Sequence, residues 1–107
     1  MSETKVWRAY GTVVRPHLNL ADGTTASVQA SHSHHCTPRN NEGPYSHVEV
    51  GFPSVRPEPW SEWEQYADDP SDPTRTVYSY VPIELVAEFI LIHNQNLISV
   101  MKSLELS

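Results

Sequence analysis

The sequence predicts a small α+β domain in which an antiparallel sheet of about four strands is covered on one face by a C-terminal helix. Three observations favour this class. Four short runs rich in β-branched and aromatic residues alternate with turn-forming proline, glycine and aspartate. A strongly apolar run with helical spacing follows the last of them. The length of 107 residues suits a single domain, 1–107, with one core.

The strands are expected at four places along the chain. A first strand over residues 5–15 is followed, across an Asp-Gly turn, by a second over residues 24–34, and the two would pair in antiparallel fashion. Residues 45–52 alternate most regularly and form the third strand. A fourth strand over residues 74–81 completes the predicted sheet.

Two helices are expected between and after these strands. Trp60 and Trp63 share one side of a short helix over residues 60–67, in the long loop before the last strand. Pro82 suits the first turn of the C-terminal helix, whose polar positions make only a narrow stripe. A groove of its own sheet could cover both apolar sides of that helix. We favour a homo-oligomer formed through residues 82–104, because so small a sheet covers one side of a helix.

Cysteine content and hydropathy predict a soluble, cytoplasmic protein. The single cysteine, Cys36, excludes an intramolecular disulfide. The first residues lack the apolar stretch of a signal peptide. The longest apolar run is far too short to cross a bilayer, so we expect no membrane contact.

Charge is distributed unevenly along the chain, whose formal net charge is −6. Residues 1–57 carry five basic and four acidic side chains, giving +1, whereas residues 58–107 carry two basic and nine acidic ones, giving −7. The dense basic patch typical of nucleic-acid binders is lacking, which argues against duplex binding. The acidic half suits a basic partner.

A histidine-rich segment at residues 31–36 is the first candidate site. In a strand, His32, His34 and Cys36 would point the same way, and His and Cys are the usual zinc ligands. His47 on the neighbouring strand would complete a structural or hydrolytic zinc site. The alternative is a polar strand end that opens into a loop, with Cys36 a small buried residue.

A pocket for a small phosphorylated ligand is the second candidate. Four glycines build neither a Walker motif nor a dinucleotide-binding loop, so an ordinary nucleotide-hydrolysing enzyme is excluded. We expect a non-enzymatic protein. Ionic and stacking contacts to a ligand could come from Arg8, Tyr10, Arg39, Tyr45 and Arg56. The alternative is that each arginine is an ordinary solvated surface residue.

An acidic segment with two tryptophans is the third candidate. Six acidic residues lie between Glu58 and Asp72 with no basic residue among them. If the segment is exposed, it would anchor a basic partner protein. The alternative is that its tryptophans fix a long excursion to the core while the carboxylates face water. The residues expected to contact the partner are Trp60, Glu62, Trp63, Glu64, Asp68 and Asp69.

In composition and local sequence, the whole chain resembles the small accessory proteins of tailed bacteriophages of high-GC hosts. The resemblance is carried by frequent proline, by arginine in excess of lysine, and by phrases such as residues 47–53 (HVEVGFP) and 81–86 (VPIELV). It implies a non-catalytic binder in the host cytoplasm. Such a protein would block a host factor, for example one used in defence, or sequester a nucleotide-like signal.

Overall fold

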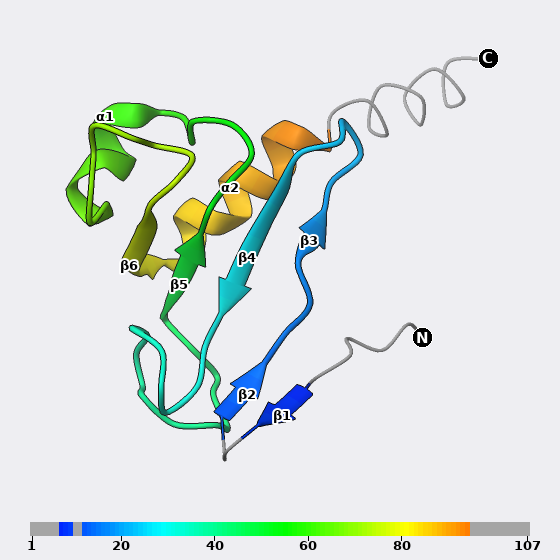
Figure 1. The fold of residues 1–107 in the computed structure, drawn as a ribbon, viewed down its shortest axis with the longest axis vertical. Coiled ribbons are helices and arrows are strands. Elements are labelled where there is room, and N and C mark those ends of the chain that lie inside the picture. Colours follow the sequence, from blue (N-terminus) through cyan, green and yellow to red (C-terminus); the bar gives the residue numbers. More distant parts are fainter. Residues whose placement is uncertain (1–6, 10–11, 95–107) are drawn as a thin grey trace.

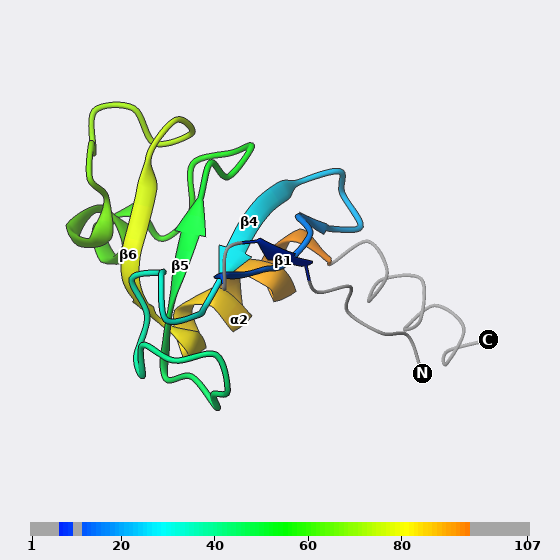
Figure 2. The ribbon, with the colours of Figure 1, turned by 60° about the horizontal axis from the view of Figure 1, so that its bottom comes forward.

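The computed structural model describes residues 7–9 and 12–94, with side chains from residue 15 onward. Its elements are β1 (Trp7–Ala9), β2 (Thr12–Val14), β3 (Leu18–Asn19), β4 (Thr25–Gln29), β5 (His47–Gly51), α1 (Trp60–Trp63), the 3-10 helix η1 (Glu64–Tyr66), β6 (Val77–Pro82) and α2 (Ile83–His93). Four strands form an antiparallel sheet in the order β3-β4-β5-β6, and α2 crosses one of its faces (Figures 1 and 2). The predicted α+β class is confirmed, as are its C-terminal helix and the short tryptophan helix before the last strand.

The N-terminal region differs from the prediction. Residues 5–15 were expected to form one strand against the second, but β1 and β2 pair with each other, with Trp7 opposite Val14. The strand that pairs with β4 is β3, across the predicted Asp-Gly turn. Both halves of the hairpin are rich in strand-forming residues, and Gly11 between them is a typical interruption of a strand pattern.

The second strand ends earlier than the predicted range 24–34, at Gln29. Beyond it, Ser31 bonds to its own neighbours: its Oγ accepts the Ser33 amide at 3.1 Å, and its carbonyl accepts the His34 amide at 3.2 Å. Serine side chains compete with strand ladders in this way. The histidines that follow therefore lie in a turn and not along a strand.

Aromatic side chains join the sheet, α1 and α2 in one core. Trp63 of α1 is fully buried, with its ring centroid 5.5 Å from that of Tyr78 on β6 and 5.7 Å from that of Phe89 on α2. Such edge and tilted contacts stabilise a core beyond the area they bury. Burial also raises the pKa of Tyr78 to about 12. The remaining core side chains are small or branched: Ala26, Ala30, Cys36, Val48, Val50, Val81, Leu85 and Val86.

Both ends of α2 are bonded to distant parts of the chain. At its start, the Ile83 amide donates to the Ser46 carbonyl at 2.9 Å. At its end, the His93 carbonyl accepts the Asp22 amide at 3.1 Å, and His93 Nδ1 lies 2.7 Å from Asp22 Oδ2. Hydrogen bonds from Thr24 and His93 lower the pKa of Asp22 to about 2. The turn between β3 and β4 therefore lies against the C-terminal end of α2.

The outer strand β6 is irregular, and its free edge is partly occupied. The β5–β6 ladder contains a register shift, and Tyr80 adopts a φ of 54°, in the left-handed region that bulky residues rarely enter. The Tyr80 amide donates to the His35 carbonyl at 3.1 Å, and the Asp68 amide donates to the Val77 carbonyl at 3.0 Å. Two loops thus take up hydrogen-bonding groups along this edge of the sheet.

Candidate functional site

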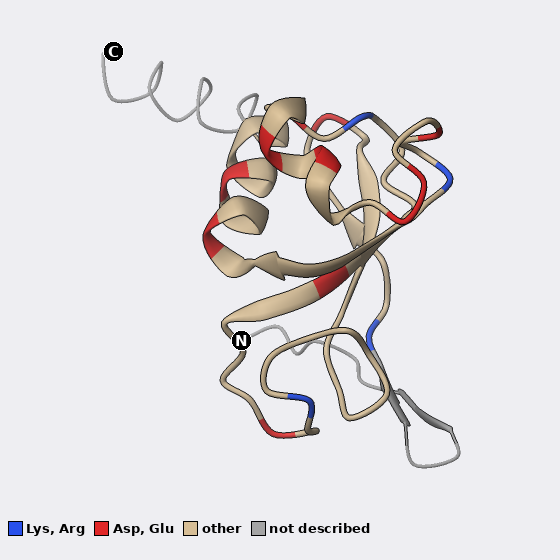
Figure 3. Ribbon diagram, turned by 90° about the vertical axis from the view of Figure 1, so that its left-hand side faces the viewer, with Lys and Arg blue, Asp and Glu red and all other residues tan. Residues whose placement is uncertain are grey.

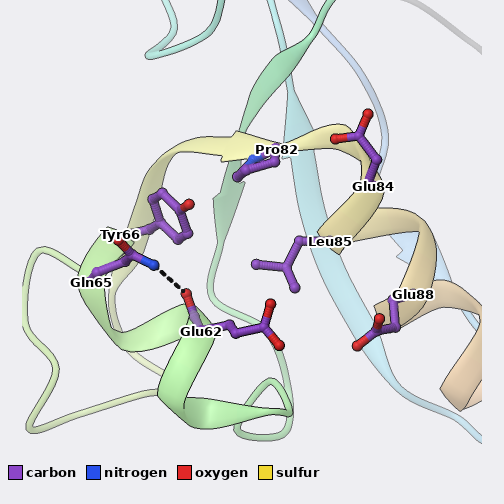
Figure 4. A pocket seen from close by; sticks show the side chains of 7 residues that line it. All are labelled: Glu62, Gln65, Tyr66, Pro82, Glu84, Leu85 and Glu88. Carbon is purple, nitrogen blue, oxygen red and sulfur yellow. Dashed lines mark hydrogen bonds between the residues drawn. The ribbon is translucent and has the colours of Figure 1, made fainter.

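An acidic hollow lies between the first half of α2 and the α1–η1 segment (Figure 4). The carboxylates of Glu62 and Glu88 turn toward each other across it, and Glu84 lies at its rim (Figure 4). Leu85, almost fully buried, supplies apolar surface between them. The hollow has a volume of about 190 Å³ and is lined by Glu62, Gln65, Tyr66, Pro82, Glu84, Leu85 and Glu88.

Helical spacing brings these carboxylates together. Glu84 and Glu88 are four residues apart and so share one side of α2. On α1, the burial of Trp63 in the core leaves the preceding Glu62 exposed. Gln65 Nε2 donates to the Glu62 carbonyl at 3.1 Å and so holds η1 against the end of α1. Two helices that pack on one core thereby gather three glutamates that are far apart in the sequence.

The chemistry of the acidic hollow suits a cation. Among the described residues, no lysine or arginine lines it. Carboxylates form strong charge-assisted hydrogen bonds with ammonium and guanidinium groups, and a partly enclosed site screens the attraction less than open water. Leu85 and the Tyr66 ring add apolar surface for the methylene stem of a long basic side chain. One Lys or Arg side chain therefore matches both its charge and its shape.

The acidic hollow is part of a wider acidic surface. Figure 3 shows acidic positions along α1 and α2 and no basic position on either helix. The basic positions lie in the loops and near the N-terminal strands (Figure 3). The uneven charge of the sequence thus becomes an uneven charge in space, with the helices on the negative side.

An apolar groove lies on the other side of α2, toward β3 and β4. Its volume is about 530 Å³, and Ile83 at its edge is 41% exposed. Only one of its lining residues is charged. The residues that line the groove are Arg15, Pro16, Leu18, Val28, Ile83, Val86, Ala87 and Ile90.

The tryptophans of the predicted partner-binding segment pack inward. Trp63 is fully buried, so its side chain offers no surface to a partner. Trp60 is half-buried, with an edge contact to Tyr78 at 6.2 Å between centroids and the Arg56 guanidinium 5.6 Å from its ring centroid. The acidic side chains of the segment stay exposed: Glu62, Glu64, Asp68 and Asp69. Of these, only Glu62 lines the acidic hollow.

Each of the four predicted zinc ligands has a local hydrogen-bond partner. These are Asn41 for His32, Ser31 for both His34 and Cys36, and Ser46 for His47. His34 Nδ1 lies 2.6 Å from Ser31 Oγ, and burial lowers the pKa of His34. In the part of the chain that the structure describes, no group of three or more His, Cys, Asp or Glu side chains is placed to hold a metal ion. The strand that would have aligned the ligands ends at Gln29.

The residues predicted to bind a phosphorylated ligand lie on two different loops where their side chains are described. Tyr10 and the side chain of Arg8 lie outside the described residues. Arg39 and Tyr45 precede β5, whereas Arg56 follows it and donates from Nε to Glu58 at 2.8 Å. Neither the acidic hollow nor the apolar groove is lined by any of the three whose side chains are described.

Sequence reasoning did not include Glu84 and Glu88 among the candidate site residues. A signal was present, because the two glutamates stand four residues apart on the narrow polar stripe of a strongly apolar helix. Their meeting with Glu62 depends on how α1 packs, which no spacing in the sequence shows. The sequence did not predict the apolar groove either. One wall of the groove is formed by β3, whereas residues 5–15 were predicted to be the edge strand.

Comparison of the chain with known protein families, with curated proteins and with solved structures finds no match in any of the three. Among the described residues, the longest helix falls short of the length and apolarity that a bilayer span requires.

Proposed function

We propose that the chain is a non-enzymatic binding protein that recognises a basic segment of a partner protein through the acidic hollow. The observation that carries the proposal is that Glu62 and Glu88 turn toward each other across a depression floored by Leu85, with Glu84 at its rim and no basic side chain among its described lining residues. A basic side chain of the partner would fill the depression. The exposed carboxylates nearby would receive its basic neighbours.

The charge of the rest of the molecule supports this function. The chain carries a formal net charge of −6, and residues 58–107 alone carry −7 (two basic and nine acidic side chains). A field of one sign steers an oppositely charged partner and raises the association rate at low ionic strength. Binding of this kind weakens as salt is added, because exposed charges are screened within about 10 Å at 0.1 M salt.

A host protein is the partner that the resemblance to phage accessory proteins implies. In that setting the chain acts in the host cytoplasm and inhibits a host factor by covering one of its basic surfaces. Inhibition by occupancy needs a complementary surface and no catalytic group. This is consistent with the described helices, which supply carboxylates and apolar side chains to the acidic hollow.

Fluorescence anisotropy with a defined basic peptide tests the proposal. The probe is a labelled nonapeptide of alternating arginine and glycine, and its citrulline analogue keeps the shape without the charge. We expect Glu62→Gln and Glu88→Gln each to weaken binding at least tenfold. The citrulline peptide should not bind, and 0.5 M salt should weaken the complex.

The matched control for these variants is Glu42→Gln, in an exposed loop outside the hollow. It changes the net charge by the same amount as either hollow variant. It should therefore leave the affinity within about twofold of wild type if the hollow is the site. Equal weakening by Glu42→Gln and Glu62→Gln would mean that the peptide responds only to net charge, and the proposed site would be wrong.

Zinc binding and sequestration of a nucleotide-like ligand stay predictions of the sequence. Native mass spectrometry of untagged protein measures both, since one spectrum reports bound zinc and any small ligand that co-purifies. Zinc that is lost with His34→Ala would support the predicted ligands. A nucleotide mass would direct mutation to Arg39, Tyr45 and Arg56.

A further inference from the structure

An exposed apolar stripe runs along α2 between the acidic hollow and the apolar groove. Successive residues of a helix are rotated by about 100°, so Ile83, Ala87 and Leu91 follow one another along one side. Ile83 is 41% exposed and Leu91 55%, and Ala87 between them is also exposed. Leu91 borders the side that carries Glu84 and Glu88, whereas Ile83 and Ala87 also line the groove.

We propose that this stripe and the apolar groove bind a second copy of the chain. The two α2 helices run parallel, related by a two-fold axis that is itself parallel to them. Leu91 of each copy then faces the groove of the other. The proposal goes beyond the proposed function, since it concerns a different partner and shares with the acidic hollow only Glu84 at its rim.

The position of Arg15 supplies the charge complementarity for this pairing. The β3–β4 turn is bonded to the C-terminal end of α2 through Asp22 and His93. β3 runs into that turn, so Arg15, which precedes β3, lies toward the other end of α2, where it lines the groove together with Ile83. This is the level of the helix at which Glu84 stands on the opposite side.

Symmetry then selects the parallel arrangement. When a two-fold axis runs parallel to the paired helices, the groove side of one α2 meets the acidic side of the other. The two copies of each residue then lie at the same height along the axis. Arg15 of one copy thereby faces Glu84 of its partner, and the contact occurs twice. With an axis perpendicular to the helices, the acidic sides of both copies would meet each other, which places like charges together.

Arg15 is held in place for such a contact. Its guanidinium donates from Nη1 to the Ala30 carbonyl and lies 5.6 Å from the centroid of the Tyr45 ring. Its backbone amide donates to Gln29 Oε1 at 2.7 Å. An arginine fixed by stacking and hydrogen bonds loses less conformational freedom when it meets a carboxylate.

Oxidative cross-linking tests the direction of the helices. In the parallel pair, position 83 of one copy lies opposite position 83 of the other, and Ile83→Cys should form a disulfide dimer under mild oxidation. In an antiparallel pair centred on Ala87, the two positions would be offset by about 12 Å along the axis, at about 1.5 Å per residue. A disulfide needs Cα atoms within about 7 Å, so no dimer would form.

Two controls accompany the cross-linking experiment. The wild-type chain, whose single cysteine Cys36 is buried, should give no cross-link. Ser61→Cys places an exposed thiol on α1, away from the proposed contact, and should give only the background level. Dimers of Ser61→Cys as abundant as those of Ile83→Cys would indicate random collision and overturn the proposal.

Sedimentation measurements on the full chain test association itself. Wild type should sediment as a dimer at tens of micromolar, and Ala87→Arg, in the middle of the stripe, should shift it to monomer. Ser61→Arg adds the same charge on α1 and should stay dimeric. A monomeric wild type would overturn the proposal. If Ala87→Arg also lowered the melting temperature of that monomer, the groove would be covered by the chain itself and not by a second copy.

A charge exchange tests the pairing of Arg15 with Glu84. Arg15→Glu and Glu84→Arg should each weaken the dimer at least tenfold, and the double variant should recover most of the affinity. Failure of the double variant to recover, with each variant folded by circular dichroism, would contradict the parallel arrangement. Peptide binding to the acidic hollow is followed with Glu62→Gln, which leaves the dimer contact intact, so the two proposals succeed or fail separately.

Discussion

The two sides of α2 differ in chemistry although one helix of 11 residues supplies both. Toward α1 it presents Glu84 and Glu88 around a small acidic hollow, and toward β3 it presents Ile83 and Ala87 along a larger apolar groove. Its third side, with Phe89, packs in the core. The comparison teaches that a short helix with a narrow polar stripe can present two surfaces of unlike chemistry, because a rotation of about 100° per residue places neighbouring residues on different sides.

The largest expected effect comes from Trp63→Ala, which removes the core contacts that hold α1, and with it Glu62, beside α2. Trp63 is fully buried against Tyr78 and Phe89, and large-to-small substitution of a buried tryptophan lowers the free energy of unfolding by about 3–5 kcal/mol. Urea denaturation followed by circular dichroism measures the loss. Trp60→Ala, at a half-buried position, should lose clearly less. Equal losses would show that the packing of α1 does not depend on Trp63.

A pH-dependent effect of intermediate size belongs to the groove side, where Asp22 is bonded to Thr24 and His93. Its pKa of about 2 in the folded chain lies below the ordinary value of 3.8, so its carboxylate stabilises the fold above about pH 4. This contribution is lost as the pH falls from 4 toward 2. The urea midpoint of wild type should therefore drop over that range by more than that of Asp22→Asn. Asp68→Asn, at an exposed loop position, should follow the wild-type curve.

The smallest expected effect is that of Glu88→Gln on stability, which should be opposite in sign to its effect on peptide binding. Glu84 and Glu88 form a like-charge pair four residues apart, which destabilises a helix by about 0.2–0.5 kcal/mol. Glu88→Gln should therefore raise the melting temperature slightly while it weakens binding of the basic peptide. A lower melting temperature for Glu88→Gln would contradict this, because it would show that Glu88 stabilises the fold.

Much of the fold could be predicted from local patterns. The alternation in residues 45–52 and the apolar run after Pro82 located β5 and α2, because the period of each pattern matches its element. The N-terminal part could not be predicted in the same way. Residues 5–15 are strand-forming throughout, and nothing local decides whether they make one long strand or a hairpin that leaves β3 to pair with β4.

The candidate site could be predicted only in part. Glu62 was expected at the surface from its place in an acidic run, and it lines the acidic hollow. Its neighbours Glu84 and Glu88 come from another element, so their meeting depends on the tertiary contact of Trp63 with Phe89. The predicted roles of His32, His34 and Cys36 rested on strand alternation, which Ser31 ends by bonding to its own backbone neighbours.

The partly occupied edge of β6 has a consequence for how this protein can acquire new partners. Peptides often bind by adding a strand to an open sheet edge, a mode in which the backbone supplies affinity and sequence matters little. Here Asp68 and His35 already bond to that edge, so this route is obstructed on β6. In the proposed function, the choice of target depends on helix side chains such as Glu62 and Glu88, so a single substitution there would redirect it without disturbing the sheet.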